Sequence, residues 1–287
     1  MSVKEIKLPG LTGNLSALKF GNESGKAIIC LHGWLDNAAS FQPLSESMSE
    51  CHWICLELPG HGRSDYRPQG CIYHYTDYIA DVHLAIEALR IENFILLGHS
   101  LGAGLVAAYS AMFPEKVHKL ILIDGIGPIS GEDDDTLKQM RNSMRFLNQK
   151  PQDQPRLYTS WEGLINRRLE AGHICRSSAQ VLLERGSKKE GDKIRVLSDG
   201  RLKQHSPIYM SQGKVLSILR GIEAESLLII ASQGLVHGRK STRDRISAFK
   251  NLTVKNIEGA HHVHMDEPQG VADLIKSFIE GERQNDL

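Results

Sequence analysis

The pentapeptide Gly98-His99-Ser100-Leu101-Gly102 has residue types that suit nucleophilic chemistry. It lies between an apolar run at 94–97, which predicts a strand, and a helical pattern at 101–113. A serine flanked by small residues in a strand-to-helix turn holds its hydroxyl out of the fold, as a nucleophile elbow requires. We therefore predict that Ser100 is a nucleophile and that the backbone N–H of Leu101 stabilises the oxyanion of its substrate. The alternative is an incidental serine in a glycine-rich turn.

A serine hydroxyl needs a base to take its proton, and the chain has 13 histidines. The best placed are in His261-His262-Val263-His264-Met265-Asp266-Glu267-Pro268, which follows a predicted strand and precedes a predicted helix. Such a loop lies at the carboxyl edge of a parallel sheet, where α/β sites form. A second interpretation uses the same letters, because His262, His264 and Asp266 match the zinc-ligand pattern His-x-His-x-Asp. That pattern normally continues with a further histidine, whereas position 267 is glutamate, so we favour a base.

A framework of strands and helices must bring these segments together. Periodic patterns predict helices at 76–90, 101–113 and 268–280, and apolar runs predict strands at 15–20, 27–31, 53–58, 94–97, 120–123, 227–231 and 254–258. Alternating strands and helices predict an α/β fold, a mostly parallel sheet with helices on both faces. Residues 125–207 break the alternation, since this block is polar and helical with no convincing strand. We expect a core formed by 1–127 and 208–287, interrupted by a helical cap inserted at 128–207.

The base needs a carboxylate partner that fixes its tautomer and stabilises the imidazolium. The predicted strand 227–231 is followed by a turn without Asp or Glu, and the next acid, Asp244, falls in a helical pattern. The predicted strand 120–123 is followed directly by Asp124, which would emerge at the edge where the base lies. We predict Asp124 as the acid. Support of the base by water or backbone, a different acid, and a purely structural Asp124 remain as alternatives.

Four motifs in order resemble those of α/β hydrolases, and the resemblance extends along nearly the whole chain. They are His32-Gly33-Trp34, Leu58-Pro59-Gly60-His61-Gly62-Arg63-Ser64-Asp65, the pentapeptide around Ser100, and the 261–268 segment. Within that superfamily the chain most resembles the serine hydrolase-like proteins, through Leu183-Glu184-Arg185-Gly186 and the histidine-rich segment. The resemblance implies that the backbone N–H of Trp34 is a second oxyanion donor. It also implies that the base is His261, which lies seven residues before Pro268.

The same resemblance makes the acid unusual. Most α/β hydrolases carry it after the seventh strand, and this chain departs from that pattern. An acid after the sixth strand, as at Asp124, resembles the arrangement in haloalkane dehalogenases. Those enzymes and epoxide hydrolases use an aspartate nucleophile, however, and here the nucleophile position holds Ser100.

The activity implied is that of a carboxylesterase-like serine hydrolase (EC 3.1.1 class) acting on a small-molecule ester through an acyl-enzyme on Ser100. A carbon–carbon bond hydrolase or lyase of the same fold is an alternative, because it shares the serine and histidine. A non-catalytic binding protein is another, because the fold also hosts such proteins. The cap should roof the pocket, and its apolar residues either line the pocket or pack together: Met140, Met144, Phe146, Leu147, Tyr158, Trp161, Leu164 and Ile165.

The composition of the chain limits the classes of partner that we expect it to bind. The 287 residues include 34 Lys+Arg and 34 Asp+Glu, a balance that gives no electrostatic footprint for nucleic acid or an anionic membrane. We find no signal-peptide pattern and no apolar run long enough to span a bilayer, and we read the five cysteines as reduced thiols. We therefore expect a cytoplasmic protein that needs no cofactor and no metal.

Overall fold

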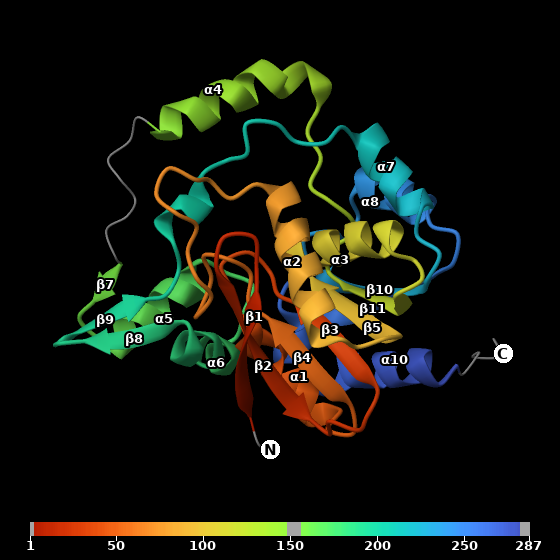
Figure 1. Cartoon of the computed structure of the whole chain (residues 1–287), viewed down its shortest axis with the longest axis horizontal. Helices are drawn as coiled ribbons and strands as arrows, with labels where there is room; N and C mark the ends of the chain where they lie inside the picture. Colours follow the sequence, from red (N-terminus) through yellow and green to blue (C-terminus); the bar gives the residue numbers. More distant parts are fainter. Residues whose placement is uncertain (1–2, 148–155, 282–287) are drawn as a thin grey trace.

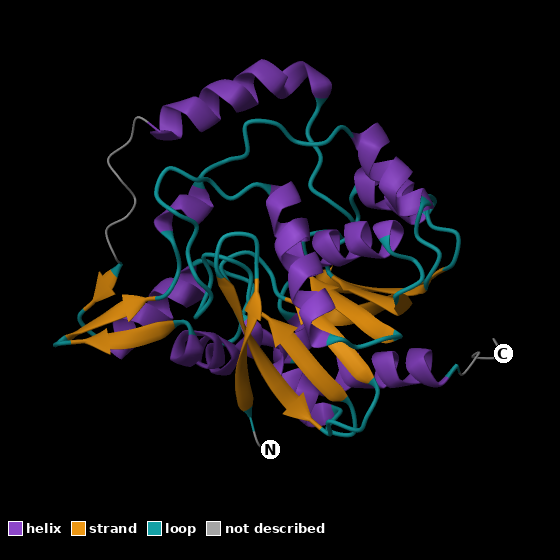
Figure 2. Ribbon diagram, in the orientation of Figure 1, coloured by secondary structure: helices purple, strands orange, loops and turns teal. Residues whose placement is uncertain are grey.

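The computed structural model describes residues 3–147 and 156–281. Its centre is an eight-stranded sheet with the order β1-β2-β4-β3-β5-β6-β10-β11, drawn in Figures 1 and 2. These strands are β1 Lys4–Pro9, β2 Asn14–Gly21, β3 Ala27–Leu31, β4 His52–Leu56, β5 Phe94–His99, β6 Val117–Ile123, β10 Glu225–Gln233 and β11 Leu252–Ala260. Strand β2 is antiparallel to both of its neighbours and all other adjacent pairs are parallel. The predicted α/β fold with a mostly parallel sheet is confirmed.

Helices cover both faces of the sheet, because successive residues of each buried strand point to opposite sides. The helices outside the 128–207 segment are η1 Ala38–Phe41, α1 Gln42–Ser47, α2 Tyr75–Leu89, α3 Leu101–Met112, α7 Gln212–Arg220, α8 Lys240–Ile246, α9 Val263–Asp266 and α10 Pro268–Glu280. On one face Leu96 and Leu122 share a core with α2, α3 and α7, and on the other Leu97 and Ile123 share a core with α1, α9 and α10.

The 128–207 segment leaves the sheet after β6, and the chain rejoins it at β10. It holds η2 Asp133–Asp135, α4 Thr136–Leu147, β7 Leu157–Tyr158, α5 Trp161–Glu170, α6 Arg176–Arg185, β8 Ser187–Glu190, β9 Lys193–Val196 and η3 Gly200–Lys203. The expectation of no strand here is wrong, since β7, β9 and β8 form a separate antiparallel sheet. Its strands have two to four residues, and β8 and β9 are rich in charged side chains, so they lack the apolar alternation that signals a strand. Figure 1 shows this sheet with α5 and α6 beside the large sheet, and α4 across the top of the view.

A buried ion pair ties the 128–207 segment to the sheet. Arg185, at the end of α6, donates from Nε to Glu57 at 2.7 Å, and Glu57 is fully buried after β4. The same guanidinium also reaches Ser16 on β2 and Glu5 on β1. Burial lowers the pKa of Arg185, but the Glu57 and Glu5 carboxylates outweigh it and the pKa lies above its usual value. Arg185 therefore stays charged and fixes α6 against three strands.

The five cysteines are free, and Cys30, Cys51 and Cys55 are buried. Burial raises the pKa of the Cys30 thiol well above its usual value, so this side chain serves as a small apolar residue. None of the helices within 3–147 and 156–281 is long and apolar enough to span a bilayer.

Candidate active site

Ser100 occupies the sharp turn between β5 and α3. Its backbone has φ +52° and ψ −114°, a conformation that a residue with a side chain rarely adopts. Close packing allows only glycine on either side: a Cβ on Gly98 would lie 2.5 Å from the Gly102 carbonyl, and one on Gly102 would lie 2.0 Å from the Leu31 oxygen. The strained turn predicted from the sequence is therefore present.

Asp124 leaves the adjacent strand at the same level as Ser100. The strand register pairs His99 with Ile123, so the next residue of each chain emerges at one carboxyl edge. The backbone N–H of Ser100 donates to the Ile123 carbonyl at 3.1 Å, which holds the two turns together. A nucleophile candidate and a carboxylate therefore stand side by side at the sheet edge.

His261 follows β11 and reaches across β10 to Asp124. Its Nδ1 lies 2.5 Å from Oδ2 of Asp124, and both side chains are buried. The same Oδ2 accepts the backbone N–H of Leu235 at 2.7 Å. Leu235 lies in the turn after β10, where most α/β hydrolases would carry the acid. In this chain that turn donates a backbone N–H to the carboxylate of Asp124, which follows the neighbouring strand β6.

Gly234 explains why the turn after β10 can approach Asp124 so closely. A Cβ at this position would lie 2.2 Å from Oδ1 of Asp124. The turn therefore covers the carboxylate with backbone alone. Sequence reasoning missed the role of 234–235, although a glycine in the turn that should carry the acid was a usable signal.

The His32-Gly33-Trp34 loop lies on the other side of Ser100. The His32 ring is fully buried and accepts the backbone N–H of Leu58 at 3.1 Å, which joins this loop to the chain after β4. The Trp34 indole donates to the Leu202 carbonyl at 3.0 Å. Trp34 and Leu101, the two predicted oxyanion donors, line the same cavity as Ser100.

A network of histidines packs against the loop of His261. His99 is bonded through Nε2 to the backbone oxygen of His261 at 2.9 Å, and its ring lies 4.6 Å from the His261 ring. Burial, together with the neighbouring histidines, lowers the pKa of His99 well below its usual value, so its ring is neutral. His99 therefore donates to the carbonyl and fixes the backbone that carries His261.

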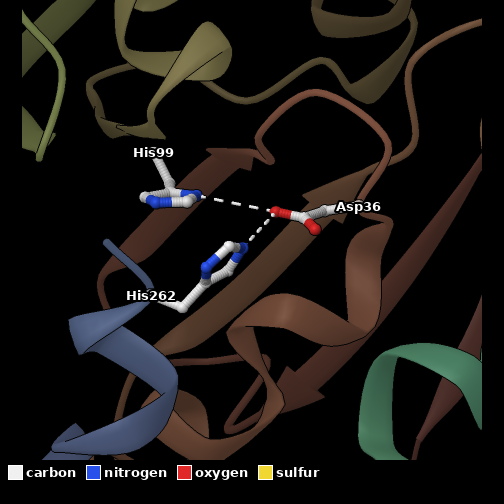
Figure 3. A group of neighbouring side chains, drawn as sticks. All are labelled: Asp36, His99 and His262. Atoms are coloured by element: carbon white, nitrogen blue, oxygen red, sulfur yellow. Dashed lines mark hydrogen bonds and ion pairs between the residues drawn. The ribbon is translucent and has the colours of Figure 1, made fainter. Parts of the chain in front are cut away.

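Asp36 joins this network to the 128–207 segment. Figure 3 shows His99 and His262 pointing toward its carboxylate, and Nε2 of His262 lies 3.1 Å from Oδ2 of Asp36. Arg168 of α5 donates to the other oxygen at 3.2 Å. Burial lowers the pKa of His262, but the Asp36 charge outweighs it and the pKa lies above its usual value. Burial raises the pKa of Asp36, but His262 and Arg168 hold it well below its usual value.

Asp36, His99 and His262 are also the group in the described chain whose potential metal-ligand atoms converge, within 4.8 Å of one another. The Arg168 guanidinium already supplies a positive charge beside Asp36, which opposes binding of a cation there. The contacts of the His-x-His-x-Asp segment do not support a zinc site there. His264 packs against Phe41 without a hydrogen bond from either ring nitrogen, and Asp266 accepts the backbone N–H of Cys175. Within the described residues, His262, His264 and Asp266 do not converge.

Comparison with known proteins identifies the family. A family model described as the alpha/beta hydrolase fold matches residues 26–268. The chain belongs to the α/β-hydrolase fold family. It is 30% identical to the serine hydrolase-like protein 2 of Homo sapiens, over 97% of this chain and 94% of that protein. The crystal structure of a hypothetical protein from Pseudomonas aeruginosa PAO1 has a TM-score of 0.89 and 31% identity, and covers 98% of this chain and 99% of that chain.

A third relative matches only part of the chain. The 2-(acetamidomethylene)succinate hydrolase of Mesorhizobium japonicum is 34% identical over 121 residues, which is 42% of this chain and 43% of that protein. Membership of the α/β-hydrolase fold family, together with the likeness to serine hydrolase-like proteins, supports a hydrolytic activity.

In this α/β hydrolase a cavity of about 1060 Å³ contains Ser100, Leu101, Trp34 and Asp124 in its lining. Among the described residues of the 128–207 segment, its two ends, 128–130 and 202–206, contribute to this lining. Of the two alternatives for the apolar residues named from the sequence, lining the pocket is not seen, since none of those that the structure describes lines the cavity. Leu164 and Ile165 instead form a small core of their own with Tyr158 and Trp161, while Met140 and Met144 are exposed.

Proposed function

We propose that the chain is a serine hydrolase that cleaves an ester-like substrate through an acyl-enzyme on Ser100. The observation that carries the proposal is the 2.5 Å hydrogen bond between His261 and Asp124. Asp124 follows β6, which is the strand next to β5 in the sheet. Ser100 follows β5 and is held at φ +52° in a strand-to-helix turn. A nucleophile, an acid and a base in that order along the chain are what acyl transfer on this fold requires.

The reaction follows from the hydrogen bonds. Because Nδ1–H of His261 donates to Asp124, its Nε2 carries the lone pair and takes the proton of Ser100 as Oγ attacks the carbonyl carbon. The Asp124 charge stabilises the resulting imidazolium. The oxyanion accepts the backbone N–H groups of Leu101 and Trp34, each worth about 3 kcal/mol. His261 then protonates the leaving alcohol, and water hydrolyses the acyl-enzyme with the same base.

The 128–207 segment is, in this proposal, a cap inserted into a core of 1–127 and 208–287. Support comes from its two ends, which line the cavity that contains Ser100, and from Trp34, whose indole bonds to Leu202 within the segment. The cap therefore sets the size of the pocket through 128–130 and 202–206.

A serine-directed phosphonate probe and an esterase assay test the proposal together. We expect labelling at Ser100 and hydrolysis of 4-nitrophenyl esters, with kcat reduced about 10⁴-fold or more in Ser100→Ala. Ser110→Ala in α3, a serine outside the cavity lining, is the control for labelling. Esterase activity that survives in Ser100→Ala would refute the assignment, and absence of labelling in folded protein would favour a non-catalytic binding protein.

A hydrolase that acts on a carbon–carbon or other non-ester bond is the second candidate. The observation in its favour is the partial likeness to 2-(acetamidomethylene)succinate hydrolase, whose name gives a substrate other than a simple ester. The substrate panel should therefore include that compound. Turnover of it above that of every ester would replace the ester proposal.

A further inference from the structure

The cavity that contains Ser100 concentrates positive charge. Its lining includes one acid, Asp124, which is already bonded to His261. The same lining includes four cationic side chains: Lys203, Lys214, Arg239 and Arg245. The whole chain has equal numbers of Lys+Arg and Asp+Glu, so this excess is local to the cavity.

These four cations lack carboxylate partners within the described part of the chain. Buried cations elsewhere in the molecule are paired: Arg67 lies 2.5 Å from Asp81, and Arg185 lies 2.7 Å from Glu57. Lys203 instead has other cations near it, and burial together with the charges of Arg156 and Arg167 lowers the pKa of Lys203 below its usual value. Lys203, Lys214 and Arg239 are exposed, so the comparison with the core applies to Arg245, which departs from this pattern of compensated charge.

Arg245 is the most informative of the four, because it is buried at 9% exposure. Its hydrogen bonds go to neutral acceptors, namely the Ile126 carbonyl at 2.7 Å, the Ser130 hydroxyl at 2.9 Å and the Gln212 side chain at 3.2 Å. Burying a guanidinium without a counter-charge costs several kcal/mol in general. A bound anion would supply the missing counter-charge.

A neutral donor accompanies these cations. Tyr75 belongs to the cavity lining, and its hydroxyl is shielded from solvent and has no hydrogen-bond partner. Buried hydroxyls are normally bonded, so an unpaired one in a ligand cavity marks a position for a ligand acceptor. Tyr75 and Arg245 thus offer a donor and a charge inside the cavity, while the exposed Lys214 and Arg239 lie in its outer lining.

We propose that this cavity contains an anion subsite and that the substrate is an ester or thioester bearing a carboxylate or a phosphate group. The proposal rests on the proposed function, because Ser100 must act on the bond that the anion positions. Arg245 and Tyr75 receive the anionic group, and Lys203, Lys214 and Arg239 raise its local concentration at the entrance.

Matched pairs of substrates test the subsite. Mono-4-nitrophenyl adipate is compared with its methyl ester, which removes the charge of the acyl part, and butyryl-coenzyme A with butyryl-N-acetylcysteamine, which removes the phosphates of the leaving group. We expect kcat/KM at low salt to favour the anionic member of at least one pair by tenfold or more. The pair that responds identifies which part of the substrate carries the anion. This preference should shrink as ionic strength rises, because salt screens exposed charges.

Variants assign the preference to residues. Lys214→Gln and Arg239→Gln should each lower the ratio of anionic to neutral kcat/KM about two- to fivefold, the range for exposed charge pairs. Arg245→Gln should lower it about 30-fold or more, as expected for a buried charged contact. The ratio is the readout because damage to the fold lowers both substrates together. Lys188→Gln on the exposed strand β8 is the control and should leave both substrates unchanged.

Binding to Ser100→Ala separates the two proposals. Saturable, salt-sensitive binding of adipate or butyryl-coenzyme A by calorimetry supports the subsite even if hydrolysis fails. Equal kcat/KM within both pairs, with Ser100 labelled and esters hydrolysed, would overturn the anion subsite and leave the serine hydrolase proposal intact. No labelling, no hydrolysis and no binding would overturn both.

Discussion

Replacing Asp124 by asparagine separates the charge of the acid from its shape. Oδ2 of Asp124 accepts two N–H groups, from His261 at 2.5 Å and Leu235 at 2.7 Å. The other oxygen is buried without a partner. The asparagine oxygen must therefore take the Oδ2 position, and its NH₂ group must face the unbonded side. Geometry is kept in this orientation, but the negative charge is lost.

The magnitude follows from the lost charge. During catalysis the imidazolium of His261 and the carboxylate of Asp124 lie with their charge centres about 4 Å apart, which is worth about 4 kcal/mol at an effective dielectric constant near 20. This corresponds to about a 10³-fold loss in kcat. A fraction of molecules with the wrong imidazole tautomer would extend the loss to about 10⁴-fold. KM should change little, because substrate contacts are untouched.

The assay is hydrolysis of 4-nitrophenyl butyrate by wild type, Asp124→Asn and Asp244→Asn. Asp244 is the first acid after β10 and is exposed on α8, so its variant is the matched control and should keep full activity. Equal thermal unfolding of the three proteins excludes a folding defect. An Asp124→Asn enzyme that keeps more than a tenth of wild-type kcat would remove Asp124 from the mechanism.

Three further changes probe the site and its support. Gly234→Ala places a Cβ 2.2 Å from Oδ1 of Asp124 and must displace it, so kcat should fall about 10²-fold, whereas Gly213→Ala, with open space around it, should not alter kcat. Arg185→Met leaves Glu57 buried without its cation and should lower the free energy of unfolding, measured with denaturant, by about 3–5 kcal/mol. A loss under about 1 kcal/mol would contradict the role of Arg185 in fixing α6 to the sheet. Burial lowers the pKa of His61 and His264 to about 3, below the unfolded value of about 6.5. The unfolded chain thus binds the extra protons, and stability, full above about pH 6.5, should fall by about 1.4 kcal/mol per pH unit for each histidine as the pH decreases. The slope of unfolding free energy against pH should drop by that amount in His264→Leu, and an unchanged slope would show that His264 does not titrate on unfolding.

The segments predicted best from the sequence are those in which local pattern and tertiary role agree. Strand β5, the turn at Ser100 and helix α3 are adjacent in the chain, so their apolar pattern and glycines specify the turn without distant information. Asp124 could be predicted as a candidate acid because it directly follows a continuous run of apolar residues. Local sequence does not distinguish Asp124 from another candidate acid. Its contacts with His261 and Leu235 form because β10 and β11 bring these residues to Asp124 from more than 100 positions away.

Features built from scattered or charged residues could not be predicted. Strands β1, β8 and β9 are short and carry many charged side chains, and such strands gain their partners from tertiary contacts instead of apolar burial. The cavity combines residues from six separate regions of the chain, so its cations had no common pattern to find. The Asp36 network likewise joins positions 36, 99, 168 and 262.

The two arginines that hold the 128–207 segment have a consequence for protein engineering. Exchanging inserted segments between related enzymes is an obvious route to new substrate ranges. Here a grafted segment without counterparts of Arg168 and Arg185 would leave Glu57 as an uncompensated anion under the graft, and would deprive Asp36 of the charge that Arg168 adds to that of His262. A workable chimera must therefore carry both arginines across, or neutralise both carboxylates in the host. Because Asp36 also contacts the histidine network behind His261, the first of these routes is the one that leaves the loop of His261 undisturbed.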